Sequence, residues 1–100
     1  MLEKIKLSLR IKNTKFDEEI EDLMGACKID LKNSGVKKID TEDVLIQQAI
    51  KLYCKANFGL DNKDSEKYKK SYESLKISLA LCGDYNVEWS LWISRIKNSN

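Results

Sequence analysis

The chain has 100 residues, of which 42% are hydrophobic and 34% charged, and its 18 basic and 16 acidic side chains leave a net charge of +2. A chain of this length buries one modest core, which leaves little room for a second large domain or a deep catalytic cleft. The nearly balanced charge argues against nucleic acid as the main ligand, and the lack of histidine and of paired cysteines argues against a zinc site.

The absence of proline and the high charged fraction favour short amphipathic helices, and the sequence divides into several such segments followed by a tail. The first segment covers residues 2–11. Leu2, Ile5 and Leu9 share one side of a helix there, while Leu7 and Ile11 also allow the alternation of a strand. Both conformations therefore stay open for this segment.

The second segment is a clearly predicted helix. Its apolar side chains recur at steps of three and four residues, which places them on one helix face: Phe16, Ile20, Leu23, Met24, Cys27 and Leu31. Thr14 is the expected N-cap, and acidic residues 17–19 followed by Lys28 and Lys32 complement the helix dipole. The sequence NSG, ending at Gly35, supplies the expected stop.

The third segment opens with the sequence DTED, where Asp40 or Thr41 is the expected N-cap, and Gly59 is the expected stop. One helix face is predicted to carry Val44, Leu45, Gln48, Ala49, Leu52, Tyr53 and Ala56. The small side chains of Ala49 and Ala56 allow a neighbouring helix to approach closely. This segment is therefore expected to be the central helix.

The fourth segment begins at Asp64 or Ser65 and is expected to end at Gly83. Its apolar stripe consists of residues at steps of four, three and four: Tyr68, Tyr72, Leu75 and Leu79. Several lysines lie around this stripe, which allows two interpretations. The tyrosines either form a basic and aromatic surface for nucleic acid or lie at the edge of a core beside a solvated face.

Two observations favour the core-edge interpretation of these tyrosines. The rings share their stripe with leucines, whereas a single-strand binder needs exposed rings on which bases can stack. Acidic residues also dilute the lysines, since Glu66 is spaced to pair with Lys70, and Glu73 with Lys69. At the edge of a core the tyrosine hydroxyls can still reach water or a partner.

The tail, residues 86–100, contains both tryptophans, Trp89 and Trp92. Its apolar residues fit a strand and a helix equally well, so its conformation stays open. It either folds back over the helical core or docks on a partner, since tryptophan is enriched where interface energy concentrates. Membrane binding at the interface is less favoured, because the segment is short and weakly basic. The candidate partner-contact residues are Trp89, Trp92, Tyr68 and Tyr72.

No pattern of catalytic residues is present in the sequence. It has no phosphate-binding glycine loop, no nucleophile arrangement and no histidine for general base chemistry, and the acidic clusters DEEIED and TED fit the first turns of helices. The prediction is that the protein is not an enzyme and has no cofactor or metal. Cys27, Cys54 and Cys82 are expected to be buried, reduced thiols in a soluble protein of a reducing compartment. The charged start does not resemble a secretory signal, and no apolar run is long enough to span a membrane.

The order of the segments carries a family resemblance over residues 2–85. The sequences LEKIKLSLRI, FDEEIEDLMGACKIDLKNSGV, DVLIQQAIKLYCKANFG and EKYKKSYESLKISLALCGDY follow one another, and the third is the best match. In this order the chain resembles the small helical head–tail connector proteins of tailed phages and prophages, often labelled DNA-packaging proteins. The resemblance implies an all-α bundle of about four helices over residues 1–85, with residues 86–100 as an additional tail.

The same resemblance implies a structural role. Such proteins form a ring beneath the portal and help to join the filled head to the tail, in the host cytoplasm during assembly and in the virion neck afterwards. The portal, other head–tail joining proteins and further copies of the chain are then the expected partners. The alternative is a small DNA-binding helical protein that uses the Lys63–Lys70 region, with binding that weakens steeply as salt increases.

Overall fold

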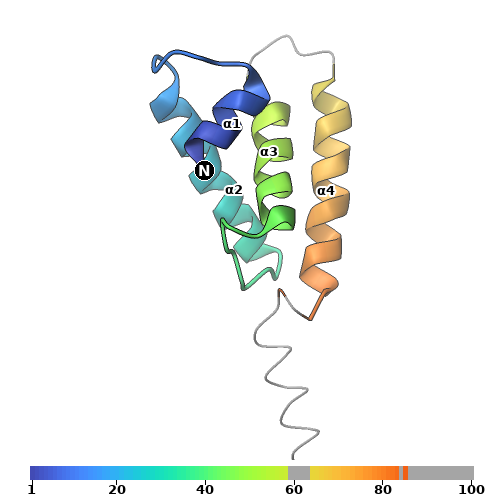
Figure 1. The fold of residues 1–100 in the computed structure, drawn as a ribbon. Helices are drawn as coiled ribbons and strands as arrows, with labels where there is room; N and C mark the ends of the chain where they lie inside the picture. The colour runs from blue at the N-terminus through green and yellow to red at the C-terminus, as the bar shows by residue number, and fades with distance from the viewer. Residues whose placement is uncertain (59–63, 84, 86–100) are drawn as a thin grey trace, which may run out of the picture.

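The computed structural model describes residues 1–58, 64–83 and 85, and this part of the chain forms α-helices and no strands. The elements are α1 (Leu2–Leu9), α2 (Asp17–Asn33), α3 (Val44–Asn57) and α4 (Ser65–Leu81). α2 and α4 run in one direction and α3 runs between them in the other, while α1 lies across α2 and α3 (Figure 1). The predicted all-α bundle is confirmed, and the helical alternative is the correct one for the first segment.

α3 is the central helix, as its small alanines predicted, because it contacts each of the other helices. The core forms around it from side chains of all four helices and of the loop after α2: Ile5, Ile20, Met24, Cys27, Leu31, Val36, Ile46, Ala49, Ile50, Cys54, Tyr72 and Leu79. The apolar stripes predicted for α2 and α4 face this core. Burial of these stripes is what stabilises helices of this length.

The face predicted for α3 is partly wrong. Ala49 is buried as predicted, but Val44, Leu45 and Gln48 are exposed. The other buried side chains of α3 are Ile46, Gln47, Ile50 and Cys54, which the prediction left out. A central helix has neighbours on several sides, so its buried surface is wider than a single stripe. Buried Gln47 is compatible with this core because its amide donates to the Thr41 carbonyl at 2.8 Å and accepts from Lys4 Nζ at 3.3 Å.

The predicted starts of two helices are also wrong. Thr14 was the expected N-cap of α2, but α2 has no side-chain cap, and only the Thr14 carbonyl takes part, by accepting from the Asp17 N–H. Phe16 instead anchors the start of the helix, because its ring packs edge-on against Phe58 with centroids 5.5 Å apart. The cap of α3 is Asp43, whose Oδ1 accepts from the Leu45 N–H at 2.8 Å. The predicted stop of α2 is confirmed, since Gly35 has a φ of 106°, which favours glycine.

The loop between α2 and α3 is tied to the end of the described chain. The Tyr85 carbonyl accepts from the backbone N–H groups of Lys37 and Lys38, at 2.7 and 2.9 Å. The Tyr85 hydroxyl donates to Asp43 at 2.8 Å, and this bond lowers the pKa of the Asp43 carboxyl. A single tyrosine therefore fixes both the loop and the cap of α3.

Candidate partner-binding surface

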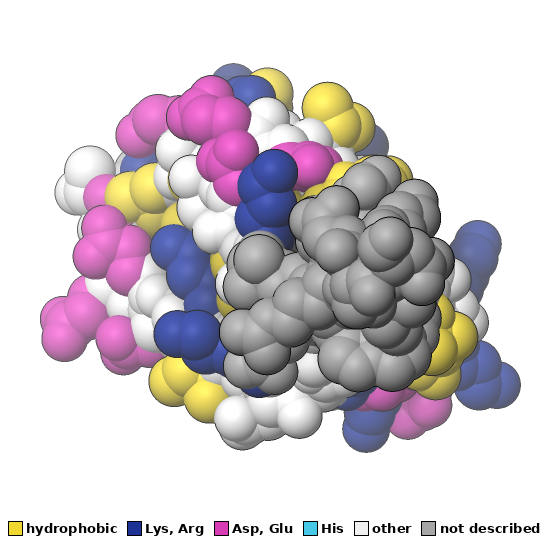
Figure 2. Space-filling model, turned by 90° about the horizontal axis from the view of Figure 1, so that it is seen from below, with side chains coloured by type: hydrophobic (Ala, Val, Ile, Leu, Met, Phe, Trp, Pro, Cys, Tyr) yellow, Lys and Arg dark blue, Asp and Glu magenta, His cyan; other side chains and the backbone are white. Residues whose placement is uncertain are grey.

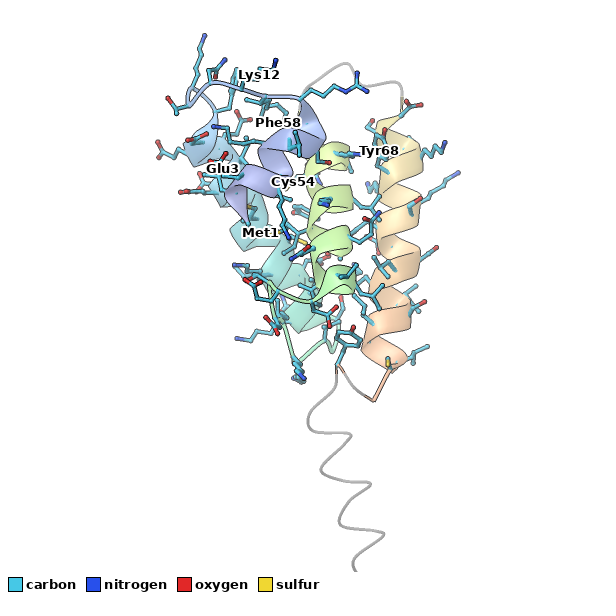
Figure 3. All side chains as sticks on the ribbon, viewed as in Figure 1. Met1, Glu3, Lys12, Cys54, Phe58 and Tyr68 are labelled. Carbon is cyan, nitrogen blue, oxygen red and sulfur yellow. The ribbon has the colours of Figure 1, made fainter. Side chains whose placement is uncertain are left out.

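The side of α4 that faces α3 carries the predicted stripe of tyrosines and leucines. Tyr72 is only 3% exposed and Leu79 is also buried, while Tyr68 and Leu75 are half-buried. Figure 3 shows Tyr68 near the start of α4, between α4 and α3. These positions confirm that the tyrosines lie in and at the edge of the core.

A polar network around Tyr72 links α4 to α2. The Tyr72 hydroxyl donates to Asp30 Oδ2 at 2.6 Å, and Lys76 Nζ donates to the same oxygen at 3.0 Å. Lys76 also pairs with Glu73 at 2.9 Å, so Glu73 pairs within its own helix with Lys76, whereas the sequence predicted Lys69. The Tyr72 ring packs edge-on against Tyr53, with centroids 5.1 Å apart. This network fixes the rotation of α4 about its axis.

The pKa shifts in this network follow from burial and hydrogen bonding. Burial raises the pKa of the Tyr72 hydroxyl, and the hydrogen bond to Asp30 raises it further, so Tyr72 remains a neutral donor. Burial also acts to raise the pKa of Asp30, but the hydrogen bonds from Tyr72 and Lys76 outweigh it and lower that pKa. The network therefore consists of a carboxylate held by one neutral donor and one cationic donor.

Because Tyr72 and Leu79 point into the core, the opposite side of α4 faces solvent. Ile77 is 58% exposed and Leu81 is 79% exposed there, four residues apart and therefore adjacent on the helix surface. Ser74 and Ser78 lie beside them and are also exposed. We call these four residues the α4 outer face. It has small and apolar side chains where the first half of α4 has lysines.

Of the residues that the sequence proposed as partner contacts, the structure describes the two tyrosines of α4. Tyr72 is inside the core and Tyr68 is half-buried, with Lys55 Nζ 5.3 Å from the centre of its ring. Trp89 and Trp92 lie outside the described residues. Sequence reasoning missed the α4 outer face, although Ile77 and Leu81 have helical spacing and lie off the tyrosine stripe.

The alternative hypothesis, DNA binding by the Lys63–Lys70 region, loses much of its support. Lys67, Lys69 and Lys70 are exposed, and Lys63 lies outside the described residues. Burial of Tyr72 and partial burial of Tyr68 leave little aromatic surface on which bases could stack. These positions do not favour a nucleic-acid site on α4.

The described residues contain few features that would support a metal site or catalysis. They contain no group of three or more His, Cys, Asp or Glu side chains that could hold a metal ion. Burial raises the pKa of both Cys27 and Cys54 to about 12, so these thiols are not activated nucleophiles. Within the same part of the chain, every helix is too short or too polar to cross a membrane.

The cysteines give a direct test of this core. With a thiol reagent near pH 8, we expect Cys82 to react quickly in the native protein, because its thiol is not in a disulfide and is partly exposed to solvent. Cys27 and Cys54 should react only as fast as the protein opens, since both are fully buried. Mass spectrometry of the labelled peptides measures the order, and denaturant should make all three react alike. Early labelling of Cys27 or Cys54 would contradict the described packing.

The described residues thus form a small helical domain in which a packed core leaves an apolar face of α4 exposed. The family described as Phage connector protein matches residues 1–86, and the chain belongs to this family. Membership gives the protein a head–tail connector role in a phage and confirms the resemblance seen in the order of its segments. Neither a curated protein nor a solved structure matches the chain.

Proposed function

We propose that the protein is a structural subunit of a head–tail connector ring that docks on the portal and helps to join head and tail during assembly. The observation that carries this proposal is the α4 outer face, where Ile77 and Leu81 are exposed to water. An apolar helix face gains free energy when a partner covers it, by about 25 cal/mol for each Å² removed from water. Contact with another protein is thus the use that this surface supports best.

The remaining parts of the proposal combine family membership with the domain division and contact residues predicted from the sequence. Residues 1–85 form the helical domain, and the bonds of Tyr85 to the loop after α2 support a domain end at this residue. Residues 86–100, with Trp89 and Trp92, form a docking segment, and the half-buried Tyr68 contributes at the edge of the contact. The protein acts without catalysis, in the host cytoplasm during assembly and then in the virion neck.

Lysine substitutions on the α4 outer face test the proposal. The double variant Ile77→Lys with Leu81→Lys should bind the portal of the same phage, or neighbouring subunits, at least about tenfold more weakly, because central apolar side chains dominate such interfaces. Stability should change little, since both side chains are exposed. Co-sedimentation with purified portal rings measures binding, and light scattering at increasing protein concentration measures ring formation.

Leu7→Lys is the matched control, because Leu7 is an equally exposed leucine on α1. It should bind and assemble like the wild-type protein. Failure of the wild-type protein to bind its own portal would overturn the connector function. Normal binding and assembly by the α4 double variant would instead remove the α4 outer face from the contact.

A further inference from the structure

The solvent-facing side of α2 has a charge pattern that is complementary to itself. At about 100° per residue, the residues of this pattern lie away from the buried stripe, with Glu21 and Lys28 along one edge of the exposed side. The exposed or half-buried members, which we call the α2 outer face, are Glu18, Glu21, Asp22, Gly25, Lys28, Ile29 and Lys32. Acidic side chains occupy the first half and lysines the second half. No described residue forms an ion pair with any of these charged side chains.

Gly25 lies at the centre of this pattern. It is midway along the chain between Glu18 and Lys32, and also midway between Asp22 and Lys28. It lies inside a helix and is exposed, and a Cβ atom added there would meet nothing within 4 Å. Glycine destabilises an exposed helix relative to alanine, so packing inside the subunit gives no reason for it. The helix dipole accounts for the order of the charges, but it does not account for a glycine at their midpoint.

A missing side chain on a helix surface permits another backbone to approach closely. Beside it, Ile29 is 63% exposed and borders an open hollow of about 330 Å³, which is also lined by Lys28 and Lys32. In Figure 2, acidic side chains gather on the left, the side on which α2 begins in Figure 1, and lysines and arginines lie nearer the middle. The surface thus combines a flat centre, an apolar contact and separated charges.

We propose that the α2 outer face pairs with the α2 outer face of a second copy of this chain, with the two helices antiparallel and crossing at Gly25. A two-fold axis through Gly25 places Glu18 opposite Lys32 of the other copy. The same axis places Glu21 near Lys28 of the other copy, since both residues lie on the same flank of α2, and each of these pairs occurs twice. Ile29 then lies beside Asp22 of the other copy, on the other flank. The occupant is a second copy because the pattern is complementary to itself.

This dimer is distinct from the proposed ring contact. A contact with two-fold symmetry closes on itself after two subunits, so it cannot by itself generate a larger ring. The α2 pair is therefore a contact of the free subunit, formed before or apart from assembly. It does not depend on the α4 outer face, which lies on another helix.

Single charge reversals provide the sharpest test. Glu18→Lys and Lys32→Glu should each raise the dissociation constant of the dimer by about tenfold or more, since each places like charges together twice. An equimolar mixture of the two variants should dimerise again, because the lysine introduced in one chain then faces the glutamate introduced in the other across the axis. Sedimentation equilibrium at low ionic strength, where exposed charges are least screened, measures each constant.

Lys70→Glu is the matched control for Lys32→Glu, since it makes the same charge change on α4 and should dimerise like the wild-type protein. Gly25→Gln tests the crossing point. It should raise the midpoint of thermal unfolding by about 2–5 °C in dilute protein, because glutamine favours a helix, and should weaken the dimer. Stability and association would then change in opposite directions.

A wild-type protein that remains monomeric at the highest attainable concentration overturns the proposal. So does a dimer that is insensitive to the charge reversals, or a Gly25→Gln variant that dimerises as tightly as the wild-type protein. None of these results bears on portal binding, so the connector function and the α2 pair fail or stand separately.

Discussion

Replacing Tyr72 with alanine is expected to lower the free energy of unfolding by about 3–5 kcal/mol, which is a large share of the stability of a small domain. The ring of Tyr72 is buried and packs against Tyr53, and its hydroxyl donates to Asp30. The variant therefore loses apolar burial, an aromatic contact and a hydrogen bond to a carboxylate. Urea denaturation followed by circular dichroism measures the change.

Tyr72→Phe separates the hydroxyl from the ring. Loss of the hydrogen bond to Asp30 should cost about 1–2 kcal/mol at neutral pH, as expected for a bond to a charged acceptor. Tyr68→Phe is the control and should cost little, because Tyr68 is half-buried. If Tyr72→Phe were as stable as the wild-type protein, the network would have no role in holding α4.

The pH dependence of this difference has a definite sign. The network lowers the pKa of Asp30 in the folded protein, so its stabilisation is complete above the pKa of an unfolded aspartate and is lost as pH falls through the lowered value. The stability difference between the wild-type protein and Tyr72→Phe should therefore shrink below about pH 4. A difference that stays constant down to about pH 2 would show that the carboxylate form of Asp30 is not what Tyr72 stabilises.

Removing Asp17 is the second substitution with a large expected effect. Lys6 is only 5% exposed, and its Nζ pairs with Asp17 Oδ1 at 2.9 Å. Asp17→Ala leaves this ammonium group largely buried without its partner, which should cost about 2–3 kcal/mol. Lys6→Met should be neutral or stabilising, because an apolar side chain of similar length then fills the same space. Urea denaturation of both variants gives the two changes in the free energy of unfolding.

Glu19→Ala is the matched control for Asp17→Ala, since both residues are acidic and lie in the first turn of α2, but Glu19 is exposed and lies outside the α2 outer face. The control removes a favourable interaction with the helix dipole and should lower the free energy of unfolding by only about 0.3–0.5 kcal/mol. Equal effects of the two alanine variants would mean that the dipole, and not the pair with Lys6, accounts for the role of Asp17.

The buried faces of α2 and α4 could be predicted from the sequence because each of these helices buries a single stripe against the core. The stripes of α2 and α4 face the core as expected, since their apolar residues recur at helical spacing on a single side. α3 has neighbours on several sides and carries apolar residues all around, so periodicity alone could not select Ile46 and Ile50 over Val44 and Leu45. The wrong caps at Thr14 and Asp40 have a different cause, because several adjacent residues there can serve as caps.

The polar contacts of the site were beyond sequence reasoning. Asp30 and Lys76 are 46 positions apart, and Asp43 and Tyr85 are 42 apart, so no local spacing indicates that they meet. The α4 outer face was within reach, because Ile77 and Leu81 are spaced as neighbours on a helix and lie off the tyrosine stripe. What the sequence lacks is the reason that these side chains stay outside, namely the rotation of α4 imposed by Tyr72 and Asp30.

The position of Tyr85 has a mechanical consequence. Its carbonyl holds the loop after α2, and its hydroxyl holds Asp43 at the start of α3. A force applied to the chain beyond residue 85 therefore acts on the start of α3 before it can detach the C-terminal end of α4 from the bundle. A protein that binds the following segment would therefore transmit force to the start of α3, and through α3 to the helices that contact it.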